Sequence, residues 1–227
     1  CQVGLMQLLD HFHWGHRTYV MGVVNVTPDS FSGDGLLSTT ETVERATHQA
    51  AQFLSAGADI LDVGGESTRP GSRSVSADEE IARVIPVMKA VAALPRAVIS
   101  IDSFKAEVAD AALDAGAHII NDVWGLRGDP AMAKTAAARG APVVLMHNRS
   151  KPNDVELDVR LGGSYLGAIY DDLMVDICTE IMELVDLARS AGVPDNQIIV
   201  DPGIGFGKTV QQNLAIINQL NLIRDLG

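Results

Sequence analysis

Polar residues end several apolar runs of this sequence, at points where a buried strand would pass into its loop. Asp102 closes the run AVISID, and Asp201 closes IIVD. Burial of a carboxylate is costly unless it is paired or hydrogen-bonded. A carboxylate accepts two parallel N–H bonds from an amino-amidine edge, and the amide of Asn121, in HIINDV, supplies a donor and an acceptor. Together they predict a site for a polar heterocycle; singly, either carboxylate could instead accept backbone N–H bonds from a following helix.

Two loops of unusual composition follow the first two apolar runs. VNVTPDSFSGDG, at 24–35, contains Asn25 and Phe31, and DVGGESTRPGSRSVS, at 62–76, contains Thr68, Arg69 and Pro70. Glycine lets backbone N–H groups approach an anion, and arginine adds a planar charged fork. Each loop alone could be an ordinary solvated loop, but the pair favours binding of an anionic substrate.

A third segment, DPGIGFGKT at 201–209, resembles a phosphate loop, but its glycine spacing departs from G-x-x-x-x-G-K-[ST]. A nucleotide site is therefore only weakly indicated. Lys208 is either a catalytic lysine or an ordinary solvated one, and Phe206 could present its ring face to a ligand. The histidines of HFHWGH precede the first strand without nearby acidic residues, so we expect them at the surface or in packing rather than on a metal.

Composition limits the classes of protein to consider. The chain has 227 residues, 47% of them apolar, and a formal net charge of −12. With no linker or low-complexity segment, this predicts one soluble domain over residues 1–227. The negative charge argues against nucleic acid or an anionic membrane as a partner. Two cysteines are too few for a disulfide framework, no apolar run approaches the ~18 residues of a membrane span, and we expect a cytoplasmic protein.

Short apolar runs alternate with longer amphipathic segments along the chain. Strands are expected at 18–26, 60–65, 97–103, 118–123, 142–147 and 198–203, and helices at 39–57, 76–94, 105–116, 129–140, 170–192 and 209–227. Ser76 and Glu79 predict a capping box, and Asp129 followed by proline predicts a helix start. Glycines predict the ends of four helices, at positions 57, 116, 140 and 192.

Apolar strands that alternate with helices predict a parallel sheet buried on both faces. Six such units fit either a doubly wound sheet or part of a (β/α)8 barrel. A barrel collects all carboxyl strand ends around one mouth, and the polar strand ends, His147 among them, favour it. His147 could equally be a satisfied wall residue. A complete barrel has eight units and typically ~250 residues, so we expect about six of the eight units in this chain.

The motifs together are similar to those of the dihydropteroate synthase family. MGVVNVTPDSFSGDG, GADILDVGGESTRPGS, SIDS, GAHIINDVWG, VVLMH and DPGIGFGKT occur in this order. The resemblance implies a (β/α)8-barrel transferase of folate biosynthesis, a family that sulfonamides target. Such an enzyme condenses 6-hydroxymethyl-7,8-dihydropterin diphosphate with p-aminobenzoate, giving 7,8-dihydropteroate and diphosphate, and it requires Mg²⁺. It also implies a homodimer for the full-length protein, with two further βα units.

The resemblance assigns roles to residues that match the family motifs. The residues implied at the pterin ring and its walls are Asp102, Asn121, Asp201, Val123 and Met146. Those implied near the diphosphate or the aminobenzoate are Asn25, Thr68, Arg69, Phe31, Pro70 and Phe206, and Lys208 is placed with the substrate-binding residues. Asn25 would be the Mg²⁺ ligand, and Asp102, Asn25 and Arg69 the catalytic residues.

The expected reaction has diphosphate leaving before the amine attacks, so that Asp102 stabilises positive charge on the pterin methylene. Two other functions stay open. One is a pterin-binding methyltransferase domain that acts on methyltetrahydrofolate with a corrinoid partner; it should lack the TPDSF and STRPG segments, which this chain has. The other is a non-catalytic barrel fragment.

Overall fold

A computed structural model of the chain describes residues 12–13, 15–27, 38–67, 74–149 and 169–227, together with the backbone of two short strands between them. The strands of the main sheet are β1 (Met21–Asn25), β2 (Ile60–Gly64), β3 (Ile99–Asp102), β4 (Ile119–Asp122), β5 (Val143–Met146) and β8 (Ile198–Asp201). The two short strands, β6 (Leu157–Asp158) and β7 (Ser164–Tyr165), pair antiparallel.

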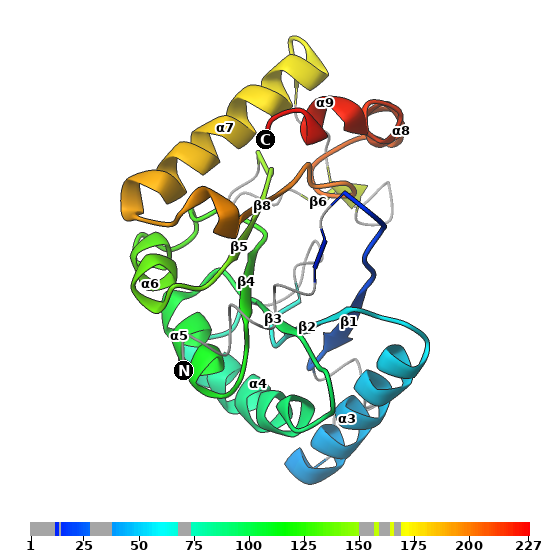
Figure 1. Cartoon of the computed structure of the whole chain (residues 1–227), viewed down its shortest axis with the longest axis vertical. Coiled ribbons are helices and arrows are strands. Elements are labelled where there is room, and N and C mark those ends of the chain that lie inside the picture. The colour runs from blue at the N-terminus through cyan, green and yellow to red at the C-terminus, as the bar shows by residue number, and fades with distance from the viewer. Residues whose placement is uncertain are drawn as a thin grey trace. The chain divides into compact units, whose positions relative to one another are not determined.

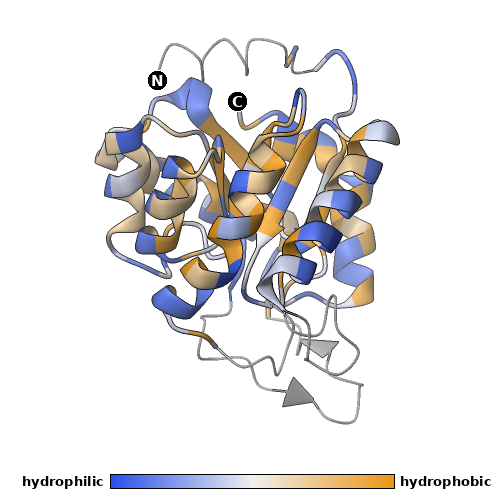
Figure 2. Ribbon diagram, turned by 90° about the horizontal axis from the view of Figure 1, so that it is seen from below, coloured by the Kyte–Doolittle hydropathy of each residue, from blue (hydrophilic) through white to orange (hydrophobic). Residues whose placement is uncertain are grey.

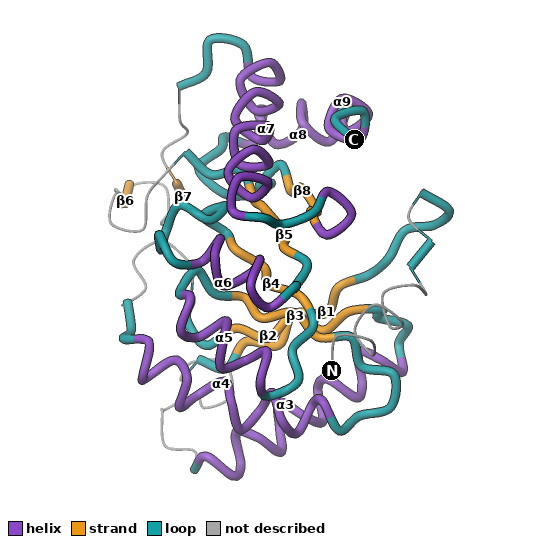
Figure 3. The backbone as a smooth tube through the Cα atoms, turned by 60° about the vertical axis from the view of Figure 1, so that its left-hand side comes forward, coloured by secondary structure: helices purple, strands orange, loops and turns teal. Residues whose placement is uncertain are grey.

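Helices separate the strands of the main sheet along the chain (Figure 3). They are α3 (Thr39–Ser55), α4 (Ala77–Ala92), α5 (Ala106–Asp114), α6 (Met132–Arg139), α7 (Leu173–Ala191), α8 (Val210–Asn218) and α9 (Leu220–Arg224), with a 3-10 turn at Asp195–Gln197. The sheet has the strand order β1-β2-β3-β4-β5-β8. All six predicted strands and their intervening helices are therefore confirmed.

Contacts divide the described chain into two compact units. The first comprises the described residues up to 67 with 74–103 and 107–120, and the second comprises 104–106 and the described residues from 121 onward. A single domain over 1–227 stays a prediction. Within the first unit, α3 and α4 pack against each other, α3 on β1 and α4 on β2 (Figure 1). Within the second, α7 packs against α6, α9 and the parallel pair β5–β8.

Apolar residues gather on the strands, whereas the helices carry both hydrophilic and hydrophobic residues (Figure 2). On β3, Ile99 and Ile101 are fully buried and alternate with Ser100 and Asp102. Successive side chains of a strand point to opposite faces, so this alternation places the polar pair on one face of the strand. Within the described part of the chain, no helix is both long and apolar enough to cross a membrane.

Two predicted helix starts differ in detail. The Ser76 hydroxyl accepts the Glu79 N–H as expected, but the Glu79 carboxylate pairs with Arg83 one turn later, so only half of the capping box forms. Asp129 does not cap α6, which begins at Met132. Its carboxylate is shared between the N–H groups of Ala131 and Ala106, because the turn before α6 lies against the start of α5.

Helix ends follow the glycine prediction more closely. Gly140 and Gly192 cap α6 and α7 with φ of 60° and 101°, a conformation that glycine adopts at little steric cost. Gly57 and Gly116 also have positive φ. The single helix expected over 209–227 is wrong, since the backbone leaves the helical region at Gln219 and separates α8 from α9.

The core that supports the end of β3 can be tested by truncation. Ile101→Ala removes a fully buried side chain and should lower the free energy of unfolding by about 2–5 kcal/mol. Urea unfolding followed by circular dichroism measures the change. Val175→Ala, at a side chain 61% exposed on α7, is the control and should change it by less than about 0.5 kcal/mol. Equal effects of the two substitutions would contradict the packing described for β3.

Candidate functional site

In the first unit, the carboxyl ends of three parallel strands lie at one level. Asn25 pairs in register with Gly64, and Gly64 pairs with Asp102. Asn25 and Asp102 are both partly buried. A Cβ atom at position 64 would lie 3.2 Å from both Cβ and Oδ2 of Asp102, closer than an ordinary contact. Glycine at 64 therefore leaves room for the Asp102 carboxylate.

A second carboxylate lies two residues below this level. Asp62 and Ser100 are register partners on β2 and β3, both are buried, and the Ser100 hydroxyl donates to Asp62 Oδ1. They precede Gly64 and Asp102 by two residues, so they lie on the same faces of their strands. Sequence reasoning missed Asp62, although a charged residue inside the apolar run ILDVGG was a usable signal.

In the second unit, Asp122 organises the turn that follows β4. Its two carboxylate oxygens accept the N–H groups of Trp124 and Leu126, each at 2.8 Å. Leu126 has a φ of 65°, an uncommon conformation for a residue other than glycine. Burial raises the pKa of Asp122 to about 6, against the effect of these two N–H donors. The carboxylate thus fixes the turn that follows Val123, one of the predicted wall residues.

Asp201 lies at the end of β8, beside the end of β5. It pairs in register with Met146, and the His147 N–H donates to the Asp201 carbonyl at 2.8 Å. One oxygen of its carboxylate accepts the Gly203 N–H at 2.7 Å. Burial raises its pKa, while the Gly203 N–H and the charge of Lys208 act to lower it. The donor belongs to the loop after β8 and not to a following helix, so the helix-start alternative does not describe this bond.

Two predicted wall residues of the pterin site, Val123 and Met146, meet in one apolar cluster of the second unit with Phe206, which was predicted near the aminobenzoate. Val123, Met146 and Trp124 are buried together, and Phe104 and Phe206 pack against them. The rings of Phe104 and Trp124 meet edge to face, with centroids 6.5 Å apart. Sequence reasoning named Val123, Met146 and Phe206 but missed the two other aromatic residues. Asp201 is the register partner of Met146, so it neighbours a member of this cluster across the strand pair.

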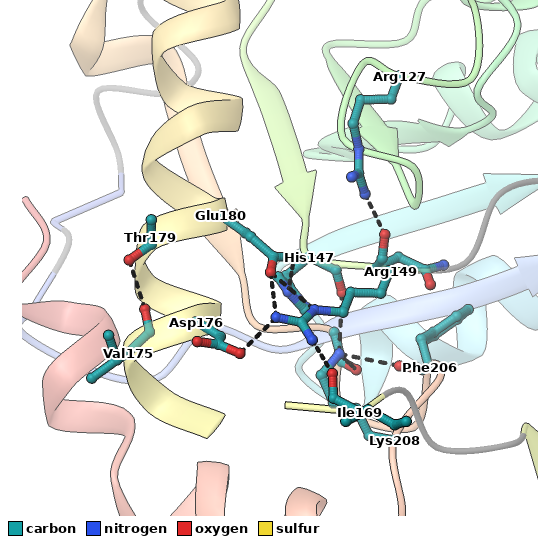
Figure 4. A network of polar contacts seen from close by, with 12 residues as sticks. Arg127, His147, Arg149, Ile169, Val175, Asp176, Thr179, Glu180, Phe206 and Lys208 are labelled. Atoms are coloured by element: carbon teal, nitrogen blue, oxygen red, sulfur yellow. Dashed lines mark hydrogen bonds and ion pairs between the residues drawn. The ribbon is translucent and has the colours of Figure 1, made fainter. Parts of the chain in front are cut away.

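A polar network joins the end of β5 to helix α7 (Figure 4). Glu180 lies 3.0 Å from His147 Nε2 through one oxygen and pairs with Arg149 through the other. Arg149 also pairs with Asp176 at 2.7 Å and lies over the ring of Tyr170. Burial lowers the pKa of His147 to about 4, so at neutral pH its uncharged ring donates to Glu180. The satisfied-wall alternative for His147 therefore holds at Nε2 only, since its buried Nδ1 has no hydrogen-bond partner among the described residues.

Lys208 is buried, which rules out the solvated one of the two alternatives for this lysine. Only 6% of the residue is exposed, and its ammonium donates to the carbonyls of His147, Gly203 and Phe206 at 2.9–3.2 Å. Four other predicted site residues lie outside the described part of the chain: Phe31, Thr68, Arg69 and Pro70. The described residues contain no group of three or more His, Cys, Asp or Glu side chains that could hold a metal ion.

The protonation of His147 predicts an acid-sensitive fold. Its pKa is about 4 in the native state and 6.5 ordinarily, so between these values the unfolded chain binds the extra proton. Stability from this group is present above pH 6.5 and is lost as the pH falls. Between pH 7 and pH 5 the loss should be about 2 kcal/mol, measured by urea unfolding. In His147→Gln this position cannot titrate, so the free energy of unfolding should fall by about 2 kcal/mol less between pH 7 and pH 5 than in the unsubstituted chain. Parallel pH profiles of the two chains would refute the prediction.

Comparisons with known proteins place these features in a family. The family model described as "Pterin binding enzyme" matches residues 21–227. A dihydropteroate synthase of Clostridium beijerinckii is 45% identical over 216 residues, which cover 95% of this chain and 73% of that protein. One of Bacillus subtilis is 46% identical and covers 93% and 67% of the two chains. This chain thus spans about two thirds to three quarters of the length of these relatives.

Solved structures agree with the sequence relatives. The crystal structure of a Clostridium difficile dihydropteroate synthase in the presence of pteroic acid superposes with a TM-score of 0.83 at 43% identity, covering 95% of this chain and 75% of that one. The predicted barrel type, with about six of its eight βα units, is thereby confirmed. The chain belongs to the pterin-binding enzyme family and, within it, to the dihydropteroate synthases, the transferases of folate biosynthesis.

Proposed function

We propose that this chain condenses 6-hydroxymethyl-7,8-dihydropterin diphosphate with p-aminobenzoate, giving 7,8-dihydropteroate and diphosphate. The observation that carries the proposal is the pairing of Asp201 with Met146 beside the apolar cluster that contains Val123 and Phe206. A partly buried carboxylate next to apolar side chains suits a heterocycle with an amino-amidine edge. Related enzymes support the two substrates, since solved structures of other dihydropteroate synthases contain 4-aminobenzoic acid or 7,8-dihydropteroate.

The proposed contacts to the pterin come from two carboxylates and one amide. Asp201 accepts N–H bonds from the pterin edge through the carboxylate oxygen that Gly203 leaves available. Asn121, partly buried at the third position of β4, supplies a donor and an acceptor. Asp102 stabilises the positive charge that develops on the pterin methylene when diphosphate leaves. These roles rest on the family membership together with the positions of the three residues at carboxyl strand ends.

Mg²⁺ is the proposed metal, and the chemistry of Asn25 fits it. The amide oxygen at the end of β1 is a hard ligand of the kind that Mg²⁺ takes, and this ion commonly uses one or two protein oxygens together with substrate phosphates and water. A bound Mg²⁺ would neutralise charge on the leaving diphosphate. Arg69 and Thr68 are proposed beside that diphosphate, and Phe31 and Pro70 beside the aminobenzoate.

The amine substrate needs no strong base in this scheme. An arylamine carries its lone pair at neutral pH, so it can attack the methylene once diphosphate has left. Exclusion of water protects the cation from capture before the amine arrives.

For the full-length protein we also propose a cytoplasmic homodimer.

The order of events can be tested by following diphosphate release. Incubation of the dihydropterin diphosphate with this chain and Mg²⁺ should release diphosphate without p-aminobenzoate, because departure precedes attack. A coupled phosphate assay measures the release, with and without the amine and with excess chelator. Strict dependence of release on p-aminobenzoate would contradict departure before attack. Pterin binding without any turnover would favour a binding fragment over an enzyme.

The role proposed for Asp201 predicts a large loss of pterin affinity on substitution. Asp201→Asn replaces one acceptor oxygen by a donor and removes the charge, so binding should weaken about 10- to 100-fold. Calorimetry with 6-hydroxymethyl-7,8-dihydropterin measures the dissociation constant. Asp186→Asn, at a carboxylate 70% exposed on α7, is the matched control and should bind as the unsubstituted chain does. Equal affinity in the Asp201 variant would remove this residue from the pterin site.

A further inference from the structure

The Lys208 side chain turns inward, although its motif resembles a loop that presents lysine to a phosphate. Its three hydrogen bonds end on the carbonyls of Gly203 at 2.9 Å, Phe206 at 3.1 Å and His147 at 3.2 Å (Figure 4). An ammonium group has three donors, so these bonds use all of them. Lys208 therefore has no N–H group left for a ligand.

Each of the three carbonyls belongs to a segment that carries a proposed pterin contact. His147 follows Met146 at the end of β5, and its N–H donates a hydrogen bond to the Asp201 carbonyl. Gly203 donates its N–H to the Asp201 carboxylate. Phe206 packs on the apolar cluster, and its N–H donates to the Gly203 carbonyl at 3.1 Å. One ammonium thus joins the end of β5 to the loop that follows Asp201.

The loop lies close against β5, and glycine is what allows this. A Cβ atom at position 203 would lie 2.0 Å from the His147 carbonyl oxygen and 3.0 Å from Lys208 Nζ. The φ of 68° at Gly203 is also strained for other residues. The carbonyl oxygens of His147 and Gly203 converge on Lys208 Nζ at 3.2 and 2.9 Å, and such convergent oxygens repel each other unless a donor lies between them. The lysine ammonium is that donor.

Charges around the ammonium come from three elements. Asp201 on β8 and Glu180 on α7 favour its protonated form, whereas Arg149, after β5, disfavours it. His147, whose carbonyl it contacts, is uncharged at neutral pH. Burial outweighs the carboxylates and lowers the pKa of Lys208 to about 8. A neutral amine has two N–H donors and a lone pair, so deprotonation would turn a lone pair toward one of the three carbonyls.

From this geometry we propose that Lys208 is a positioning residue for pterin binding. It fixes the segment 202–207 against β5, and so aims the Asp201 carboxylate and the Phe206 ring, without touching the substrate. The inference rests on the proposed function and deepens it, because it makes pterin affinity depend on a group outside the pterin contacts.

Three variants and a pH series test the proposal. Lys208→Met keeps the apolar stem and removes the donors, Lys208→Arg keeps a charge that does not titrate, and Lys134→Met, at an exposed lysine on α6, is the control. Binding of 6-hydroxymethyl-7,8-dihydropterin is measured by calorimetry from pH 6.5 to 9.5. Circular dichroism melts at each pH report the fold.

Lys208→Met loses the three hydrogen bonds of the ammonium, so its pterin binding at pH 7 should weaken about 10- to 100-fold. The pterin affinity of Lys134→Met should equal that of the unsubstituted chain. Lys208→Arg should recover part of the affinity. In the unsubstituted chain, affinity should fall about tenfold between pH 7 and pH 9, as the protonated fraction of a group with a pKa of about 8 falls. This fall should be absent in Lys208→Arg, whereas a merely structural lysine would not give a pH profile that arginine flattens.

Two results would overturn the proposal. One is unchanged pterin affinity in a folded Lys208→Met chain. The other is the same alkaline profile in the unsubstituted chain and in Lys208→Arg, which would assign the titration to the ligand or another residue. If Lys208→Met does not fold, the comparison of these two profiles decides the question. Failure of the unsubstituted chain to bind pterin at pH 7 would instead refute the proposed function.

Discussion

A carboxylate removed from water at a strand end can stay ionised only if donors or a cation accompany it, and this constraint governs Asp122 and Asp201. Asp122 takes two backbone N–H groups from its own turn, and Asp201 takes one from its loop and the nearby charge of Lys208. Their carboxylates are therefore held in place before a ligand arrives. Such preorganisation reduces the ordering that binding requires.

The end of β5 shows how two elements share this support. Helix α7 contributes Glu180, whose carboxylate accepts a hydrogen bond from the His147 ring through one oxygen and pairs with Arg149 through the other. The loop after β8 contributes Lys208, whose ammonium donates a hydrogen bond to the His147 carbonyl. The side chain and the backbone of one residue are thus fixed from different elements. Met146, which precedes it, is positioned by both.

Sequence patterns predicted the strands well because buried parallel strands need continuous apolar runs, and the runs ended where polar residues began. Site residues at those ends, such as Asp102 and Asp201, were predictable for the same reason. Other features depended on neighbours that no local pattern contains. The Glu79 carboxylate pairs with Arg83 and therefore does not complete the predicted capping box. Asp62 was not predicted as a polar site residue, because its partner Ser100 lies on the next strand.

Lys208 illustrates the limit most clearly. A lysine after a glycine-rich turn points toward a phosphate or back into the fold according to where acceptor oxygens lie, and sequence spacing alone does not place them. Here the carbonyls of Gly203 and Phe206 converge with that of His147, 61 residues away, and their combined negative potential draws the ammonium inward. A planar guanidinium matches three convergent acceptors less well than a compact ammonium does. Gly203 thus serves close backbone packing, and the lysine of this motif binds backbone carbonyls of its own fold.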